Sequence, residues 1–433
     1  MTTARVELWG SPIGAVSWEP ERELGFFEYE PAFLESGIEV SPLTMPLATR
    51  IYSFPALARA AFHGLPGLLA DVLPDRFGNA VIDAWLATQG RTPESFNPVE
   101  RLCYTGRRGM GALEFVPAVG PSASPDDELD VGALVKLAGA VLASREQFAT
   151  RAVQEDARAT ADLLRVGTSA GGARPKAVVA WNPETGVLRS GQVDLPEGFS
   201  HWLLKFDGVS GNTDHDVDQP LGYGRIELAY HRMAVAAGIE MSECRLLEEN
   251  GRAHFMTRRF DRTRTGAKLH LQSLGAIAHL DFNLPGAHSY EEAMLVIRRL
   301  DLPMAAIEEQ FRRMAFNVLA RNQDDHVKNI AFLMDKSGTW HLSPAFDVTY
   351  AYNPSGNWTG RHQMSLHGKR DEFEREDFRT VGKAVGLKRG RALAILDEVG
   401  AAVRAWPDFA RSAGLSDERT EQVGRAHRLE LAE

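Results

Sequence analysis

The sequence predicts an α+β protein with a mixed N-terminal part, a strand-rich middle part and a mainly helical C-terminal part. Three observations predict this class. Short apolar runs bounded by turn residues occur near the start, strand-like segments recur between residues 177 and 260, and apolar residues at helical spacing dominate from residue 304 onward. The length of 433 residues suits two or three domains. We therefore divide the chain into residues 1–120, 121–260 and 261–433.

Residues 1–120 are expected to combine strands with helices. A turn is expected at Gly10–Pro12. The apolar residues between Leu65 and Leu86 have helical spacing, and Pro74 is expected to break that run into two helices. The segment 119–128 (VGPSASPDDE) is rich in Pro, Ser and acidic residues, so it is the best linker candidate. Strands are predicted at Val6–Trp9, Gly14–Trp18 and Leu24–Tyr29, and an apolar segment follows at Ala112–Val116.

The middle part is expected to hold a small sheet. Residues 129–164 look helical, with a loop near residue 160. After them, Asn182–Gly186 has the composition of a turn between two strands, and Gly238 is suited to end the helix Ile226–Ala237. The predicted strands of this sheet are Ala177–Trp181, Val187–Arg189, His201–Phe206, Cys244–Leu247 and His254–Phe260.

The C-terminal part is expected to be mainly helical. Met304, Ile307, Phe311, Met314 and Val318 form one apolar stripe of a helix. Two short strands, 330–334 and 339–342, are expected to form a hairpin. The polar, glycine-rich segment 353–361 is expected to be a flexible loop, and the tail from residue 379 is expected to be helical.

Composition excludes several classes of protein. The net charge of −10 argues against a chain that binds nucleic acid over a broad basic surface. Two distant cysteines, Cys103 and Cys244, make a disulfide scaffold or a zinc site improbable. The absence of a signal peptide and of a long apolar run predicts a cytoplasmic protein without a membrane span.

The segment 321–329 (RNQDDHVKN) carries the strongest chemical signal. Asp324 and Asn329 stand five residues apart, and Asp347 follows the predicted hairpin. Protein kinases use this order, in which the first Asp orients or deprotonates the attacking hydroxyl. The Asn and the second Asp provide oxygen ligands for Mg²⁺. The alternative is that Asp324, Asp325 and Asn329 only cap a turn, because Asp and Asn are common turn residues.

Two further segments precede this loop. The segment 166–176 (VGTSAGGARPK) is rich in glycine and other small residues, so its main-chain amides could approach phosphate oxygens closely. Arg174 and Lys176 add positive charge to it. The segment lacks the Walker A ending and could instead be a flexible interdomain loop. Lys205, within the apolar strand, either extends to solvent or is buried beside an anion, with Glu227 on the next helix as its partner. Together these features follow the order in which they occur along protein kinases. That order is a glycine loop, a strand lysine, a helix glutamate, the Asp-x-x-x-x-Asn motif and a second Asp.

The chain resembles the HipA family, the serine/threonine kinase toxins of bacterial toxin–antitoxin modules. The resemblance covers nearly the whole chain, and the combination of Asp-Asp-His-Val-Lys-Asn with Ser-Pro-Ala-Phe-Asp is specific. The segments that show the resemblance are LLRVGTSAGGARPKAVV (163–179), HWLLKF (201–206), RRFDR (258–262), NQDDHVKNIAF (322–332), LSPAFDV (342–348) and MSLHGK (364–369). In the N-terminal part they are LTMPL (43–47), LLADVLPD (68–75) and GALEFVP (111–117).

This resemblance implies a protein-kinase-like core of two lobes, one strand-rich and one helical, with an N-terminal mixed α/β subdomain. It implies ATP and Mg²⁺ as cofactors, Asp324 as the catalytic residue, and Asn329 and Asp347 as the metal ligands. Residues 258–260 resemble the hinge strand that holds adenine through main-chain groups. The implied nucleotide-binding residues are Gly171, Gly172, Ala173, Arg174, Lys176, Lys205, Arg258, Arg259, Phe260, His326 and Lys328.

The resemblance also implies regulation and partners. Ser169 occupies the position where family members autophosphorylate a loop serine, which switches the kinase off. The expected partners are a helix-turn-helix antitoxin similar to HipB, a protein substrate such as an aminoacyl-tRNA synthetase, and operator DNA, contacted mainly through the antitoxin. The chain departs from the family at Asp325, often glycine, at Arg258, often glutamate, and at Pro175, often polar. The extra carboxylate of Asp325 could assist metal binding or be exposed.

Two other functions remain open from the sequence alone. One is a kinase-like co-repressor with weak phosphotransfer, and retention of Asp324, Asn329, Asp347 and Lys205 argues against it. The other is a small-molecule kinase on the same fold, because substrate surfaces lie on loops that the sequence does not define. His326 could support the catalytic loop by hydrogen bonding or could be purely structural.

Overall fold

The computed structural model describes residues 2–120, 128–143, 162–164, 166–167, 174–192, 195–209 and 221–433. The chain forms two compact units. The first falls within residues 1–212, 247–272 and 333–339, and the second within 213–246, 273–332 and 340–433. The division into three parts at residues 120 and 260 stays a prediction.

The first unit begins with an antiparallel sheet of five strands in the order β4-β3-β2-β1-β5. Trp9 and Gly10, with φ of 52° and 81°, make the first turn. Both residues are left-handed, as a tight two-residue hairpin requires. The turn therefore lies one residue earlier than predicted, and Ser11 and Pro12 already belong to a strand. The strands are β1 (Thr2–Leu8), β2 (Ser11–Glu19), β3 (Leu24–Tyr29), β4 (Ile51–Tyr52) and β5 (Leu113–Val116).

Short helices accompany this sheet. The predicted break at Pro74 is confirmed, because one helix ends at Ala70 and the next begins at Arg76. Asp75 caps the new helix by accepting a hydrogen bond from the Gly78 N–H at 2.5 Å. The helices are α1 (Pro31–Leu34), α2 (Arg59–Phe62), α3 (Gly67–Ala70), α4 (Arg76–Thr88), the 3₁₀ helix η1 (Pro93–Ser95) and α5 (Pro98–Thr105).

A second sheet of five strands follows in the order β7-β6-β8-β10-β9. All five predicted strands are confirmed, with boundaries shifted by at most two residues. The helix α6 (Val131–Ala143) and α4 contribute apolar side chains to one core with β6, β8 and β10. The strands are β6 (Lys176–Trp181), β7 (Leu188–Ser190), β8 (Ser200–Lys205), β9 (Cys244–Glu249) and β10 (Arg252–Arg258).

A buried ion cluster ties the chain after β10 to the N-terminal part of the same unit. Asp261 is fully buried and accepts hydrogen bonds from Arg259 at 2.6 Å, Arg262 at 2.9 Å and the Gly111 N–H at 2.7 Å. Burial alone would raise the pKa of Asp261, but the two guanidinium groups and the hydrogen bonds outweigh it and lower the pKa well below its usual range. Lys268 extends the cluster by donating to Glu114 at 2.8 Å.

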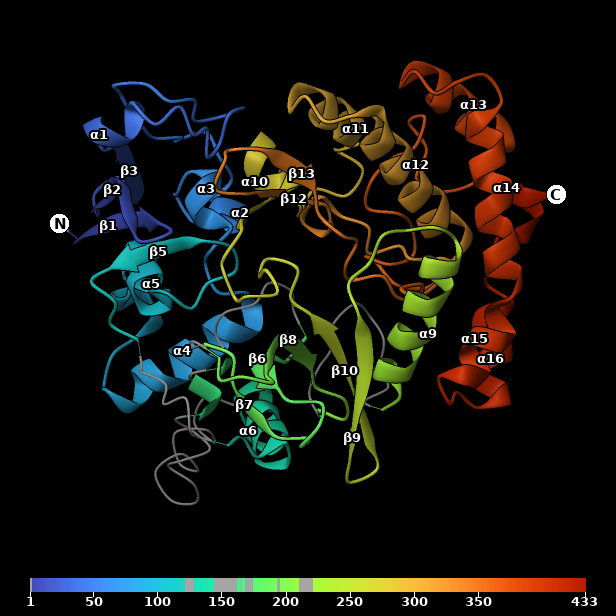
Figure 1. The fold of residues 1–433 in the computed structure, drawn as a ribbon, viewed down its shortest axis with the longest axis horizontal. Coiled ribbons are helices and arrows are strands. Elements are labelled where there is room, and N and C mark those ends of the chain that lie inside the picture. Colours follow the sequence, from blue (N-terminus) through green and yellow to red (C-terminus); the bar gives the residue numbers. More distant parts are fainter. Residues whose placement is uncertain are drawn as a thin grey trace. The chain divides into compact units, whose positions relative to one another are not determined.

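The second unit is mainly helical, and Figure 1 shows α12 (Met304–Leu319) beside α11 (Tyr290–Arg299) and α14 (Arg391–Arg404). Most of the apolar stripe predicted for α12 is buried, because Ile307, Phe311, Met314 and Val318 are at most 2% exposed. Met304, at the first position of the helix, is 43% exposed, so the predicted stripe is wrong there. The helical tail begins at Arg375, four residues earlier than predicted. The other helices are α9 (Tyr223–Ala236), α10 (Leu274–Ala278), α13 (Arg375–Ala384), α15 (Trp406–Ser412), α16 (Asp417–Gly424) and the 3₁₀ helices η3 (Val327–Asn329) and η4 (Leu429–Ala432).

A third sheet has the order β11-β12-β13. Its strands are β11 (His270–Ser273), β12 (Ala331–Met334) and β13 (Trp340–Leu342). The predicted hairpin between β12 and β13 is confirmed. Within the described residues, no helix combines the length and the apolarity needed to cross a lipid bilayer.

Candidate functional site

The loop between α12 and β12 brings Asp324 and Asn329 together. The side-chain amide of Asn329 donates to the main-chain oxygen of Asp324 at 2.9 Å, and the His326 N–H donates to the same oxygen at 3.0 Å. Because the amide nitrogen of Asn329 is engaged in this way, its amide oxygen is the atom left for another ligand. The five-residue spacing seen in the sequence is therefore the span of one closed loop.

Asp347 follows β13 in an unusual backbone conformation. Its φ is +57°, a left-handed value that non-glycine residues adopt infrequently and that recurs at functional sites. Its chain neighbours Phe346 and Val348 line the same small cavity as Asn329. The structure thus brings the chain on both sides of Asp347 to the loop that carries Asn329, and the role of Asp347 as a metal ligand stays a prediction.

His326 and Lys328 both pack on one aromatic ring. The imidazole of His326 lies 5.7 Å from the ring centroid of Phe282, and the Lys328 ammonium lies 4.5 Å from it. His326 Nε2 is 3.8 Å from Asp324 Oδ1, which is too long for a hydrogen bond. The hydrogen bond through which His326 supports the loop is made by its main chain. Lys328 as a nucleotide-binding residue stays a prediction.

Asp325 is a buried anchor of the loop, so of its two alternatives the exposed one is wrong, and a part in metal binding stays a prediction. It is 4% exposed and accepts hydrogen bonds from Tyr290 Oη at 2.5 Å, His362 Nδ1 at 2.7 Å and the Gln363 N–H at 2.7 Å. Burial alone would raise the pKa of Asp325, but His362 and the hydrogen bonds outweigh burial and lower it. The pKa of Tyr290 is raised well above its usual value, first by burial and then by Asp325.

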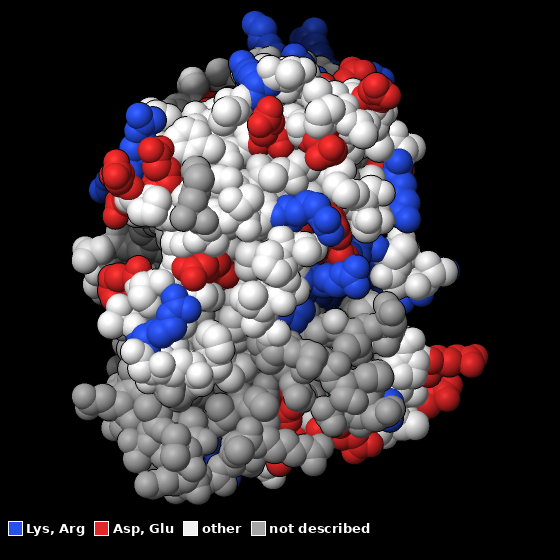
Figure 2. All heavy atoms as spheres, turned by 90° about the vertical axis from the view of Figure 1, so that its left-hand side faces the viewer, with Lys and Arg blue, Asp and Glu red and all other residues white. Residues whose placement is uncertain are grey.

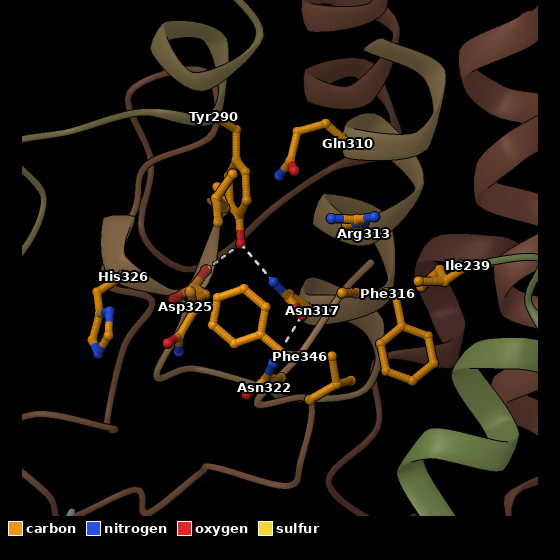
Figure 3. Close-up of a pocket in the computed structure, with 14 residues that line it drawn as sticks. Ile239, Tyr290, Gln310, Arg313, Phe316, Asn317, Asn322, Asp325, His326 and Phe346 are labelled. Carbon is orange, nitrogen blue, oxygen red and sulfur yellow. Dashed lines mark hydrogen bonds between the residues drawn. The ribbon is translucent and has the colours of Figure 1, made fainter. Parts of the chain in front are cut away.

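The cavity beside Asn329 is too small for a nucleotide. Figure 3 shows the hydrogen-bonded chain from Asp325 through Tyr290 and Asn317 to Asn322 along its wall. Its volume of about 30 Å³ admits water but is far too small for a nucleotide. Gln310 Oε1 and Asn322 Oδ1 are buried there without a hydrogen-bond partner. We therefore regard the cavity as part of the support of the loop.

In the first unit, Lys176 and Lys205 lie directly opposite each other on β6 and β8. The Phe206 N–H donates to the Pro175 oxygen at 3.0 Å, so the two lysines form a non-hydrogen-bonded pair, in which side chains are closest. Lys176 is 3% and Lys205 8% exposed. Lys205 is therefore buried rather than extended to solvent.

Each of these lysines has a neighbour that suits its positive charge, a carboxylate beside Lys176 and an aromatic ring beside Lys205. Lys176 Nζ is 3.6 Å from Asp75 Oδ2, and Lys205 Nζ lies 5.7 Å from the ring centroid of Phe255. Ammonium groups donate charge-assisted hydrogen bonds to phosphate oxygens, so both lysines stay candidates for the nucleotide site. Glu227, the predicted partner of Lys205, is buried in the second unit, and their pairing stays a prediction.

The predicted hinge residues differ in their surroundings. Arg258 is half-buried and ends β10 opposite Trp202, and Phe260 is half-buried beyond it. The side chain of Arg259 is committed to Asp261, and its N–H donates to the His201 oxygen at 3.0 Å. Side-chain contact between Arg259 and a nucleotide is therefore disfavoured, whereas binding of adenine by other main-chain groups stays a prediction.

Most of the predicted glycine loop lies outside the described residues. Arg174 is half-buried before β6. Ser169, Gly171, Gly172 and Ala173 lie outside the described residues, so the phosphate-binding and autophosphorylation predictions stay open there.

Three residues of the site were missed by sequence reasoning. Trp358 Nε1 donates to Asp324 Oδ1 at 2.7 Å, and His362 and Gln363 bind Asp325. These residues belong to the segment 353–363, most of which was expected to be a flexible loop because of its polar, glycine-rich composition. A tryptophan within an otherwise polar loop was the available signal.

Comparison with known proteins decides the family. The model of the HipA N-terminal domain matches residues 4–116, and that of the HipA-like C-terminal domain matches residues 168–406, more than half of the chain. The chain belongs to the HipA family. Its likeness to the Shewanella oneidensis HipA, determined in complex with HipB and operator DNA, covers 99% of this chain and 96% of the other, with a TM-score of 0.67 and 16% identity. This likeness of folds confirms the predicted fold class.

A curated relative is the Sinorhizobium fredii protein named Putative kinase Y4mE. It is 25% identical to the HipA-family chain over 240 residues, which are 50% of this chain and 53% of the relative. The chain thus matches about half of the length of that relative.

Proposed function

We propose that this HipA-family chain is an ATP- and Mg²⁺-dependent serine/threonine kinase that acts as the toxin of a toxin–antitoxin module. One observation carries the proposal: the hydrogen bond between Asn329 and the main chain of Asp324 closes the loop with the kinase spacing. Asp347, which follows the adjacent strand pair, completes the set of three. The name of the Sinorhizobium relative, a kinase, supports the same activity.

The residues of the second unit suit Mg²⁺ and a hydroxyl substrate. The amide oxygen of Asn329 and the carboxylate of Asp347 are hard oxygen donors, and Mg²⁺ is commonly bound by one or two such groups together with phosphates and water. Bound Mg²⁺ would neutralise charge on the phosphates of ATP. Asp324 would orient the hydroxyl of the substrate and accept its proton.

The residues of the first unit suit the nucleotide. Lys176 and Lys205 supply two buried positive charges on one face of a sheet, and a triphosphate is a fitting counterion for them. Ser169, in the preceding loop, is the proposed autophosphorylation site. A phosphate there would add negative charge to the segment that precedes Lys176 in the sequence, and we expect it to weaken the binding of ATP.

The proposed partners are a helix-turn-helix antitoxin and a protein substrate in the cytoplasm. The Shewanella relative was determined with HipB and operator DNA, which supports an antitoxin partner for this chain. On the face shown in Figure 2, Lys and Arg side chains are interspersed with Asp and Glu. The net charge of −10 does not favour binding to the phosphate backbone of DNA, so we assign operator contacts mainly to the antitoxin.

Transfer of phosphate from γ-labelled ATP tests the activity. We expect the wild-type chain with Mg²⁺ to label itself or dephosphorylated casein, and Asp324→Ala to lower the rate about 10³-fold. Asp397→Ala is the matched control, because Asp397 is 53% exposed in a surface ion pair with Arg375. Absence of label with the wild type, or full activity of Asp324→Ala, would contradict the proposal. Growth arrest on expression, abolished by the same substitution, tests the toxin role.

A further inference from the structure

The segment Trp358–Gln363 is fastened to the loop that carries Asp324. The Gln323 amide donates to the Thr359 oxygen at 3.0 Å, and the Gln363 amide donates to the Gln323 oxygen at 3.2 Å. Gln363 Nε2 also donates to the Trp358 oxygen at 2.6 Å, which closes the segment on itself. Thr359 is fully buried and Gln363 is 3% exposed. We call residues 358–363 the anchoring segment.

The anchoring segment reaches the carboxylate of Asp324 through Trp358. The indole N–H donates to Asp324 Oδ1 at 2.7 Å, a short bond to a charged acceptor. The main chain of Asp324 is held separately, by Asn329 and by the His326 N–H. The main chain and the side chain of Asp324 are therefore fixed by different segments of the second unit.

We propose that Trp358 is a positioning residue, which holds the Asp324 carboxylate in the orientation that accepts the proton of the substrate hydroxyl. This inference rests on the proposed kinase function. A carboxylate with one oxygen bound to a rigid indole has fewer side-chain orientations than a free one. Since displacements of about 1 Å can cost about 100-fold in rate, the fixed orientation has kinetic value.

An opposite role for Trp358, as a lid that blocks Asp324, does not agree with the surroundings. Segments that open are drawn from regions with few buried contacts and solvent-exposed hydrogen bonds. The anchoring segment is not such a region, because its residues Thr359, His362 and Gln363 are buried. Displacement of the anchoring segment would disturb these buried hydrogen bonds, so the main chain that carries Trp358 is held in place beside the loop of Asp324.

Substitution of Trp358 separates the two roles. We expect Trp358→Phe to lower the rate of phosphate transfer from γ-labelled ATP to casein about 10-fold or more. The affinity for the fluorescent nucleotide TNP-ATP should stay within about twofold, because the lysines of the first unit are unchanged. Trp9→Phe is the matched control, since the Trp9 indole donates to the Lys268 oxygen at 2.8 Å, in the first unit. This control should retain the wild-type rate.

A second variant isolates the N–H group from the packing of the ring. Replacement of Trp358 by benzothienylalanine keeps the shape of the indole and removes only the donor, so it should lose rate as Trp358→Phe does while keeping the thermal midpoint. A faster reaction of either variant, or a wild-type rate with benzothienylalanine, would overturn the positioning role. A wild-type chain that binds TNP-ATP but transfers no phosphate would instead refute the kinase function, and the inference would fall with it.

Discussion

Nδ1 of His362 donates a hydrogen bond to Asp325 at 2.7 Å, and both side chains are at most 1% exposed. An ionised carboxylate can only accept, so the ring carries its proton on Nδ1. The other ring nitrogen lies 3.4 Å from an Arg428 nitrogen, near the C-terminal end of the second unit. Asp325 therefore connects the loop that carries Asp324 with a buried polar network.

Replacement of Asp325 by Asn should lower stability more than activity. The neutral amide cannot satisfy all three donors, and removing one partner from a buried ionic network costs about 3 kcal/mol. We expect urea denaturation at neutral pH to show this loss, whereas Asp397→Asn, in an exposed ion pair, should change little. A loss at Asp325 no larger than at Asp397 would show that the buried network contributes no net stability.

The pH dependence of this loss has a definite sign. The pKa of Asp325 is lowered in the folded chain, so its stabilising contribution is fully present above the unfolded pKa of about 4. It disappears as the pH falls through the lowered folded pKa. The difference between wild type and Asp325→Asn should thus be constant near neutral pH and shrink in acid. A difference that grows in acid would contradict the assignment.

The parts of the site that repeat a local pattern could be predicted from the sequence. Asp324 and Asn329 are five residues apart, so one loop brings them together, and the buried strand around Lys205 is visible as an apolar run. Asp325 could not be assigned, because its partners come from residues 290 and 362, far along the chain. Trp358 lies in a segment whose polar composition resembles a loop, and only tertiary hydrogen bonds show that it is anchored.

Substitutions of Asn329 should separate its two tasks. Asn329→Ala removes both the proposed metal-binding oxygen and the donor to Asp324, whereas Asn329→Asp keeps an oxygen ligand and loses only the donor. If metal binding dominates, Asn329→Asp should retain about 10-fold more transferase activity than Asn329→Ala at saturating Mg²⁺. Titration of the rate with Mg²⁺ measures this. Equal activity of the two variants would mean that the hydrogen bond to Asp324 is the essential contribution.

Lys205→Met should weaken the binding of nucleotide. The substitution keeps an unbranched side chain of similar length within β8 and removes one of two opposed ammonium groups. We expect the dissociation constant for ATP to rise about 10-fold, as measured by calorimetry with Mg²⁺ present. Lys336→Met, at an exposed position of the same unit, should bind as the wild type does. Unchanged affinity of Lys205→Met would exclude this lysine from the nucleotide site.

Asp261→Ala should destabilise the first unit strongly. The substitution leaves Arg259 and Arg262, whose side chains are at most 6% exposed, without their shared carboxylate, which costs about 3–5 kcal/mol. In contrast, Arg107→Ala removes a 71% exposed partner of Glu114 and should cost at most about 1 kcal/mol.

Because the pKa of Asp261 is lowered in the folded chain, its contribution to stability is present above a pH of about 4 and is lost in stronger acid. Limited proteolysis and urea denaturation of both variants at neutral pH would show the difference. Similar stability of the two would mean that the cluster is replaceable by packing, and that the N-terminal part is held to residues 259–268 by apolar contacts alone.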